Sequence, residues 1–285
     1  MRLGGFPQGN ARPLGCRPFF AEKEPQALSP GATNPRPVCR LAHRARQRPQ
    51  APFGRLPGRL GGIVLAWAVI LFTVAAAVCG IAGNGGLLAS EMLRNAPPET
   101  TGLPQAEYAA VGRMTADYLS GRTDVFQHRF SDENGTIYQC FQPHEAEHMA
   151  DCRKLIRLAE ILRLVFALAG MTILFEGILI PKRRKGIARG VIIGLRSAGV
   201  VGVGLLIWGL IDFDGLFTAF HRIAFTNDGW LLDPRTDLLI RLMPTGFFTT
   251  LAVRIVIWVA GAAVLTAAAA RLTERNGGDP SLRSG

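Results

Sequence analysis

Four long apolar stretches constrain this chain more than any other feature of its sequence. They cover residues 61–83, 158–180, 191–211 and 247–269. Each is close to the roughly 20 residues that cross a hydrocarbon core of about 30 Å. Stretches of this length and composition are typical of membrane-spanning helices. The sequence therefore predicts an all-α membrane protein built on a four-transmembrane-helix bundle.

The positions of the basic residues predict the orientation of the bundle. The formal net charge is +11, from 32 Lys and Arg against 21 Asp and Glu. Basic residues concentrate in the first sixty positions, in KRRK at 182–185 and beyond Arg271. With the N-terminal segment in the cytoplasm, all three clusters lie on the cytoplasmic side, as the positive-inside rule requires. No nucleic-acid partner is expected, because no basic segment is interleaved with aromatic residues on a folded module.

The composition changes along the chain predict three parts. Residues 1–59 are rich in Pro, Gly and Arg and have little apolar periodicity, which predicts a disordered basic cytoplasmic arm. This arm could equally be an upstream extension from a misassigned start codon. Residues 60–272 are expected to form the transmembrane domain, and residues 273–285 a cytoplasmic tail.

Between the first two spans, residues 84–154 predict a small α+β extracellular cap. Apolar residues in 104–121 recur at helical spacing and end at Gly121. Asn134-Gly135 between two apolar-polar segments predicts a hairpin turn. From Pro143 the chain runs into the second span with no further Pro and no Gly before Gly170, which predicts one continuous helix. The sequence leaves open whether Cys140 and Cys152, both in this part, are bonded.

Residues 212–246 form the expected outer motif loop before the last span. Together with the start of that span they carry an aromatic belt of the kind found at membrane interfaces. Its members are Phe213, Phe217, Phe220, Phe225, Trp230, Phe247 and Phe248.

Two histidines are candidates for chemistry. His148 precedes the second span and His221 follows the third, so the predicted topology places both at the outer interface, where they could meet. An imidazole exchanges protons near neutral pH, and a nearby carboxylate such as Glu145, Glu147 or Asp151 could fix its tautomer. The competing interpretation is an amphipathic residue with a hydrated polar tip. His128 and His144 are expected to be surface residues of the cap.

Other classes of function fit the residues less well. The five cysteines have no CxxC spacing, and neither a metal nor a cofactor is expected. A transporter tends to place ionisable residues near mid-span. Here they fall toward the span ends, at Glu160, Arg163, Glu176, Arg196 and Arg254.

Two motifs resemble the lipoprotein intramolecular transacylases, a family of bacterial integral membrane proteins. The motifs are EAEHMADC at 145–152 and FHRIAFTNDGWLLDPRTDLLIRLMPTGFF at 220–248, within a likeness over about residues 60–270. The residues in register are Glu145, His148, Met149 and Asp151 in the first motif, and Phe220, His221, Phe225, Asn227, Trp230, Asp233, Pro234, Asp237 and Pro244 in the second. The long basic arm departs from the family pattern, and so does Cys152, where an aliphatic residue is expected.

The resemblance implies an enzyme of the bacterial cell membrane. Its substrate would be a diacylglyceryl lipoprotein, with membrane lipids as its surroundings, and it would move the sn-2 acyl chain to the N-terminal cysteine α-amine, giving a lyso-form lipoprotein. The resemblance implies that His148 and His221 are catalytic. It implies orienting or substrate-binding roles for Glu145, Asp151, Phe220, Phe225, Asn227, Trp230 and Asp237. The alternative is a non-enzymatic membrane module that binds lipid or a partner protein through its aromatic outer face.

Overall fold

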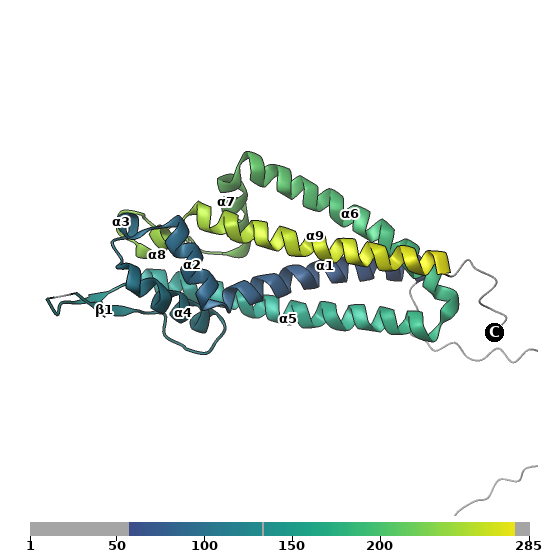
Figure 1. Cartoon of the computed structure of the whole chain (residues 1–285), viewed down its shortest axis with the longest axis horizontal. Helices are drawn as coiled ribbons and strands as arrows, with labels where there is room; N and C mark the ends of the chain where they lie inside the picture. The colour runs from purple at the N-terminus through teal and green to yellow at the C-terminus, as the bar shows by residue number, and fades with distance from the viewer. Residues whose placement is uncertain (1–56, 133, 277–285) are drawn as a thin grey trace, which may run out of the picture. The chain divides into compact units, whose positions relative to one another are not determined.

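The structure, a computed structural model, describes residues 57–132 and 134–276. Within these residues, four helices are long and apolar enough to cross a membrane. They are α1 (Gly58–Ala82), α5 (Pro143–Leu179), α6 (Arg184–Ile211, preceded by the short η2, Pro181–Arg183) and α9 (Thr245–Asn276). Helix α1 packs against α5, α6 and α9, and the cap elements gather at one end of these helices (Figure 1). The predicted four-helix membrane bundle is confirmed.

Helix α5 is longer than a membrane span requires. Its 37 residues extend over about 55 Å at 1.5 Å per residue, against a hydrocarbon core of about 30 Å. Pro143 occupies its first turn, and Gln142 and Glu145 form a reciprocal capping box at its start. The single continuous helix expected from the sequence is therefore present. Its polar first turns carry His148 beyond the apolar stretch.

Helices α1 and α6 cross closely over the first half of α6. A methyl group at Gly62 or Gly190 would collide with the backbone of the other helix. Small residues at four-residue spacing let helix backbones approach closely inside a membrane. Those in the crossing are Gly58, Gly62 and Ala66 on α1, and Gly186, Gly190 and Gly194 on α6. Further along α6, Trp67 of α1 still donates to Ser197 at 3.1 Å, but a methyl group at position 199, 202 or 204 would have no neighbour within 4 Å.

The cap contains the predicted helix and hairpin, together with helices that were not predicted. Its elements are α2 (Gly85–Asn95), α3 (Pro98–Thr101), η1 (Gln105–Glu107), α4 (Tyr108–Leu119), β1 (Arg129–Ser131) and β2 (Ile137–Gln139). The strands pair antiparallel, and Gly135 in the turn has φ 78°. Helix α2 begins with two glycines, which have low helix propensity, so the sequence did not predict it. Asn84 caps this helix by accepting a hydrogen bond from the Leu87 amide at 3.0 Å.

The cap shares one hydrophobic core with three later segments. Leu88, Met92 and Val111 of α2 and α4 lie in this core with Met149 of α5. Leu242 of α8 (Leu238–Leu242) and Phe247 at the start of α9 complete it. This core fixes the first turns of α5 against the segment that follows α7. Cys140 and Cys152 both have free thiols.

The outer motif segment is more ordered than a loop. It holds α7 (Phe213–Ala224) as well as α8. Asp212 caps α7 by accepting from the Gly215 amide at 2.8 Å, so the helix restarts immediately after α6 ends. The predicted boundaries also shift at both ends of the domain, because α1 begins at Gly58 and α9 continues to Asn276. The rest of the predicted arm and tail lies outside the described residues.

Candidate active site

The structure brings His148 and His221 together. His148 lies near the start of α5 and His221 in the last turn of α7. Their ring centroids are 6.2 Å apart and the ring planes are inclined by 29°. Both residues are buried, with 9% and 7% of their surface exposed. Two segments separated by a whole transmembrane hairpin therefore place two imidazoles within reach of one bound molecule.

Helix α7 determines the tautomer of His221. Its Nδ1 lies 2.8 Å from the carbonyl oxygen of Phe217, one turn earlier. Because a carbonyl only accepts hydrogen bonds, Nδ1 carries the hydrogen and Nε2 keeps its lone pair. Burial lowers the pKa of His221 below its usual value, and the Phe217 carbonyl opposes this shift only in part. His221 is therefore a neutral base at neutral pH.

His148 has a thiol, rather than a carboxylate, as its polar neighbour. Its Nε2 lies 3.5 Å from Sγ of Cys152, one turn further along α5. The ring of Phe225 packs edge-on against it, with centroids 5.2 Å apart. Glu145 and Asp151 make their hydrogen bonds to other groups in this structure, so an orienting role for either stays a prediction.

Aromatic side chains surround His221. The nearest ring is Phe217, with its centroid 4.0 Å away, followed by Trp230 at 5.1 Å. Phe220 and Phe225 each lie 5.4 Å away. Three of the predicted site residues, Phe220, Phe225 and Trp230, thus contact the same histidine. They form a partly dry wall on one side of it.

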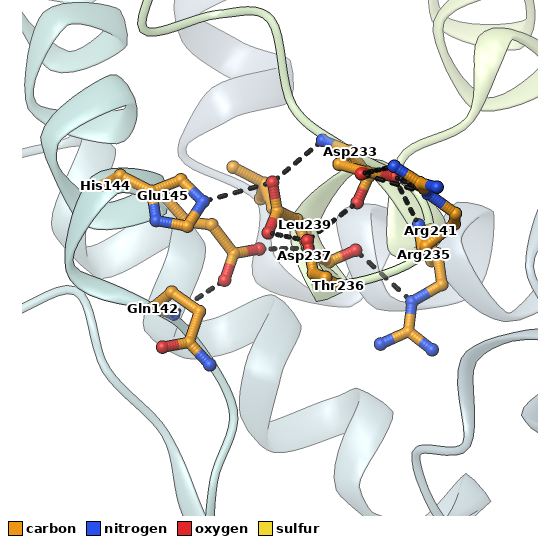
Figure 2. A network of polar contacts seen from close by, with 9 residues as sticks. All are labelled: Gln142, His144, Glu145, Asp233, Arg235, Thr236, Asp237, Leu239 and Arg241. Atoms are coloured by element: carbon orange, nitrogen blue, oxygen red, sulfur yellow. Dashed lines mark hydrogen bonds and ion pairs between the residues drawn. The ribbon is translucent and has the colours of Figure 1, made fainter.

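Glu145 anchors the start of α5 to α8, within the outer motif segment (Figure 2). It is fully buried, and its two oxygens accept from the backbone amides of Gln142 and Leu239, each at 2.6 Å. One carboxylate therefore satisfies the helix N-terminus and the first turn of α8 together. Its contribution is to hold the turn that carries His148, at a distance from the imidazole itself.

Asp237 forms the second polar anchor beside Glu145 (Figure 2). Its Oδ2 lies 3.1 Å from Nε2 of His144 and accepts from the Asp233 amide at 2.9 Å, while Oδ1 accepts from Thr236 at 2.8 Å. Burial alone would raise the pKa of Asp237, but hydrogen bonds from His144, Asp233 and Thr236 bring it below its usual range. The anchor fixes the Asp233–Asp237 turn against α5.

Asp151 and Asn227 link α5 to the segment after α7. Nδ2 of Asn227 donates to Asp151 at 2.9 Å, and Lys154 donates to the other oxygen of Asp151 at 2.7 Å. The Asn227 side-chain oxygen accepts from Gly229, closing the local turn. This link lies next to both histidines along the chain and holds the turn leading to Trp230.

The segment His144–His148 reads His-Glu-Ala-Glu-His, which is the spacing of a zinc-binding helix. The prediction of no metal site treated this spacing as absent, which the sequence contradicts. In the structure the two histidines have different partners, Asp237 for His144 and Cys152 for His148. Across residues 57–132 and 134–276, no group of three or more His, Cys, Asp and Glu is placed to hold a metal ion.

The other two cap histidines have ion-pair partners. His128 is less exposed than expected, with 17% of its side chain accessible, and pairs with Glu107 at 2.7 Å. His144 is half exposed, as expected for a surface residue, although it pairs with Asp237.

Sequence reasoning missed Cys152 and Phe217 as neighbours of the two site histidines. The helical spacing of four residues, which stacks side chains on one face, was the signal that could have found both.

Comparisons with known proteins agree with this arrangement. Residues 63–248 match the family model described as lipoprotein intramolecular transacylase Lit. No curated protein is similar enough in sequence to match the chain. The solved in meso structure of the membrane integral Lit from Bacillus cereus is 20% identical, with a TM-score of 0.60 over 77% of this chain and 96% of that one. A structure of the same protein with one histidine replaced by alanine gives a TM-score of 0.57 at 20% identity, over 77% of this chain and 94% of that one.

The structural likeness shows the fold, and the family match covers more than half of the chain. A non-enzymatic lipid-binding module is no longer tenable, because the matching family consists of transacylases. The chain is a multi-pass membrane enzyme that belongs to the family of lipoprotein intramolecular transacylases.

Proposed function

We propose that this enzyme moves the sn-2 acyl chain of a diacylglyceryl lipoprotein to the α-amine of the lipoprotein's N-terminal cysteine, using His148 and His221 for proton transfer. The pairing of the two buried imidazoles, with centroids 6.2 Å apart, is the observation that carries this proposal. The rings are too far apart to bond directly to one another. They are close enough for a single head group to touch both.

His221 is the better candidate for the base. Its Nε2 is unprotonated because Nδ1 donates to Phe217, and burial keeps the ring neutral. In the first step the amine nitrogen attacks the ester carbonyl carbon, and His221 takes the hydrogen that the nitrogen must lose. A tetrahedral intermediate forms, with the new C–N bond made and the ester C–O bond still present.

His148 is placed to complete the transfer. When the intermediate collapses, the C–O bond breaks and the sn-2 oxygen must gain a proton. His148 gives a ring proton to that oxygen, and the proton held at His221 passes to His148 across the bound head group, so both imidazoles return to their starting state. The overall reaction converts one ester to one amide, with no net uptake or release of protons.

The protein also contributes by positioning. Donor and acceptor belong to one substrate molecule, so the enzyme needs only to fold the head group until amine and carbonyl meet. Such alignment can contribute up to about 7–11 kcal/mol. The aromatic wall of Phe220, Phe225 and Trp230 would leave the acyl chains in lipid while the reacting atoms leave water.

We place this site on the outer face of the bacterial cell membrane. The N-terminal segment, the Lys182–Arg184 turn and the end of α9 carry the basic residues. With these parts in the cytoplasm, the cap and both histidines face outward. A reporter fused into the Asn134-Gly135 turn should be accessible from outside the cell, and cytoplasmic labelling of this turn would contradict the orientation.

The reaction can be tested in a bacterium that lacks lipoprotein N-acylation. Expression of the full chain should yield lipoproteins that carry one acyl chain on nitrogen and one on glycerol, as mass spectrometry of the N-terminal peptide would show. The matched control is a variant with both histidines replaced by alanine and with the same amount of protein in the membrane. Both chains remaining on glycerol, with the wild-type enzyme folded, would refute the proposal.

A further inference from the structure

A shallow depression lies at the end of the bundle away from the histidines. Its volume is about 330 Å³, and it is formed where the first turns of α1 and α6 meet the last turns of α9. The lining residues are Arg59, Arg189, Ile192, Ile193, Arg196 and Glu274. None of them takes part in the site described above. Three arginines and one carboxylate give the depression a net positive charge.

Arg196 is an exposed charged residue that lies unusually deep in the membrane along α6. Between Arg196 and Asp212 the helix is apolar for about 22 Å, which is less than the roughly 30 Å of a hydrocarbon core. The Arg196 backbone therefore lies inside the core. A helical side chain points toward the N-terminus of its helix, so this guanidinium extends toward Arg189 and the membrane surface.

The arginines lack full compensation by protein carboxylates. Arg189 lies 3.7 Å from Glu274. In the part of the chain that the structure describes, neither Arg59 nor Arg196 has an ion-pair partner. A charged side chain within a span normally pairs with another group or marks a binding site. The charge of this depression thus calls for an anion from outside the described residues.

We propose that the depression binds one anionic phospholipid, with its phosphate between Arg59, Arg189 and Arg196 and an acyl chain along Ile192 and Ile193. Guanidinium groups match phosphate oxygens in bidentate geometry. Basic pockets between transmembrane helices at one membrane surface suit such head groups. A lipid is favoured over a soluble anion for two reasons. Ile193 is exposed beside the arginines and could contact an acyl chain, and the backbone of Arg196 lies within the apolar layer.

A bound phosphate would also contact the turns where α1 and α6 cross closely. Arg59 follows Gly58 at the start of α1, and Arg189 precedes Gly190 on α6. A phosphate that bridges the two arginines would hold the same turns that the glycines bring into contact. The lipid would therefore stabilise the arrangement of α1, α6 and α9.

The test measures lipid binding to the purified full chain in a neutral detergent. Phosphatidylglycerol should bind with a saturable affinity and raise the Tm, while phosphatidylcholine and inorganic phosphate should do neither. Arg196→Gln should weaken phosphatidylglycerol binding roughly tenfold, because it removes a charge-assisted contact to phosphate. Arg196→Lys should bind with intermediate affinity, since a single ammonium replaces the planar fork.

Lys185→Gln is the matched control, because it removes a positive charge at the same end of the bundle without lining the depression. It should bind phosphatidylglycerol as the wild type does. If Arg196→Gln fails to fold, Arg59→Gln provides the same comparison. Equal loss in Lys185→Gln, equal binding of phosphatidylcholine, or binding of inorganic phosphate alone would each overturn the proposal.

Discussion

The two histidines of the site are supported in different ways. His148 stands on α5 just after a fully buried carboxylate, Glu145, that binds two backbone amides. His221 stands on α7, which follows the largely exposed second half of α6, and is surrounded mainly by aromatic rings. Buried charge-assisted hydrogen bonds are directional, whereas aromatic contacts tolerate small displacements.

This difference indicates that the α5 side of the site is more rigid than the α7 side. In the proposed reaction, the α5 side would hold one end of the head group in a fixed position. The α7 side would have more room to adjust during the proposed reaction, because its polar links are exposed: Asn227 to Asp151 of α5, and Thr245 of α9 to Asp214 at 2.8 Å. Each of the following changes tests one side of the comparison.

Removing either imidazole should have the largest effect. His148→Ala and His221→Ala should each reduce transfer by about 10²–10⁴-fold, the usual contribution of general acid-base catalysis. The double variant should be little worse than either single variant if the two act as a unit. His128→Ala is the control and should retain activity. Comparable activity in all three single variants would remove the case for the pair.

Breaking the buried support of His148 should come next. Glu145→Ala leaves the Gln142 and Leu239 amides without their acceptor, which should cost about 2–3 kcal/mol of stability. Thermal unfolding in detergent measures this loss. Glu147→Ala, an exposed acidic residue on the same helix, is the control and should leave the Tm nearly unchanged. Equal Tm values for the two variants would mean that the anchor contributes nothing.

Breaking the link on the His221 side should have a smaller effect. Asn227→Ala removes an exposed hydrogen bond worth about 0.5–1.5 kcal/mol, so transfer should fall by roughly tenfold or less. The Tm should remain near that of the wild type. Asp228→Ala, the neighbouring exposed residue, serves as the control. A large loss of stability in Asn227→Ala would show that this side is as rigid as the other.

Of the changes considered, a moderate change of pH should have the smallest effect on activity. Burial disfavours the charged form of His221 and lowers its pKa, so the neutral base persists below its usual pKa of about 6.5. Activity should therefore be retained at pH 6.5 and be lost as the pH falls through the lowered pKa. The acidic limb of the kcat profile, measured at saturating substrate, tests this sign. A midpoint above 6.5 would contradict a buried neutral base.

Much of the fold was predictable because its signals are local. Each span is an apolar run long enough to be recognised without knowledge of its neighbours, and Asn134-Gly135 specifies its hairpin by backbone conformation alone. Helix α2 was missed because its two initial glycines have low helix propensity, while its stability comes from the shared core with α4 and α9. Helix α7 was missed because its aromatic residues read equally well as an interfacial belt.

The pairing of the two histidines was predictable from the sequence, but the hydrogen-bond partners of the neighbouring carboxylates were not. The topology placed His148 and His221 on one side of the membrane, and the structure brings their rings together. The sequence did not indicate that Glu145 binds Leu239, or that Asp151 binds Asn227 and Lys154. A carboxylate on the same helical face as a histidine can reach several donors. Which donor it meets depends on segments that arrive from elsewhere.

The sequence by itself determined the four spans, the cap hairpin and the two histidines at one interface, since hydropathy and turn chemistry act over a few neighbouring residues. Only the tertiary structure decided that Glu145 meets an amide 94 residues away, and that Arg59, Arg189 and Arg196 line one depression. The physical reason is that hydrogen-bond partners and ion positions are set by the packing of distant helices. No local pattern encodes that packing.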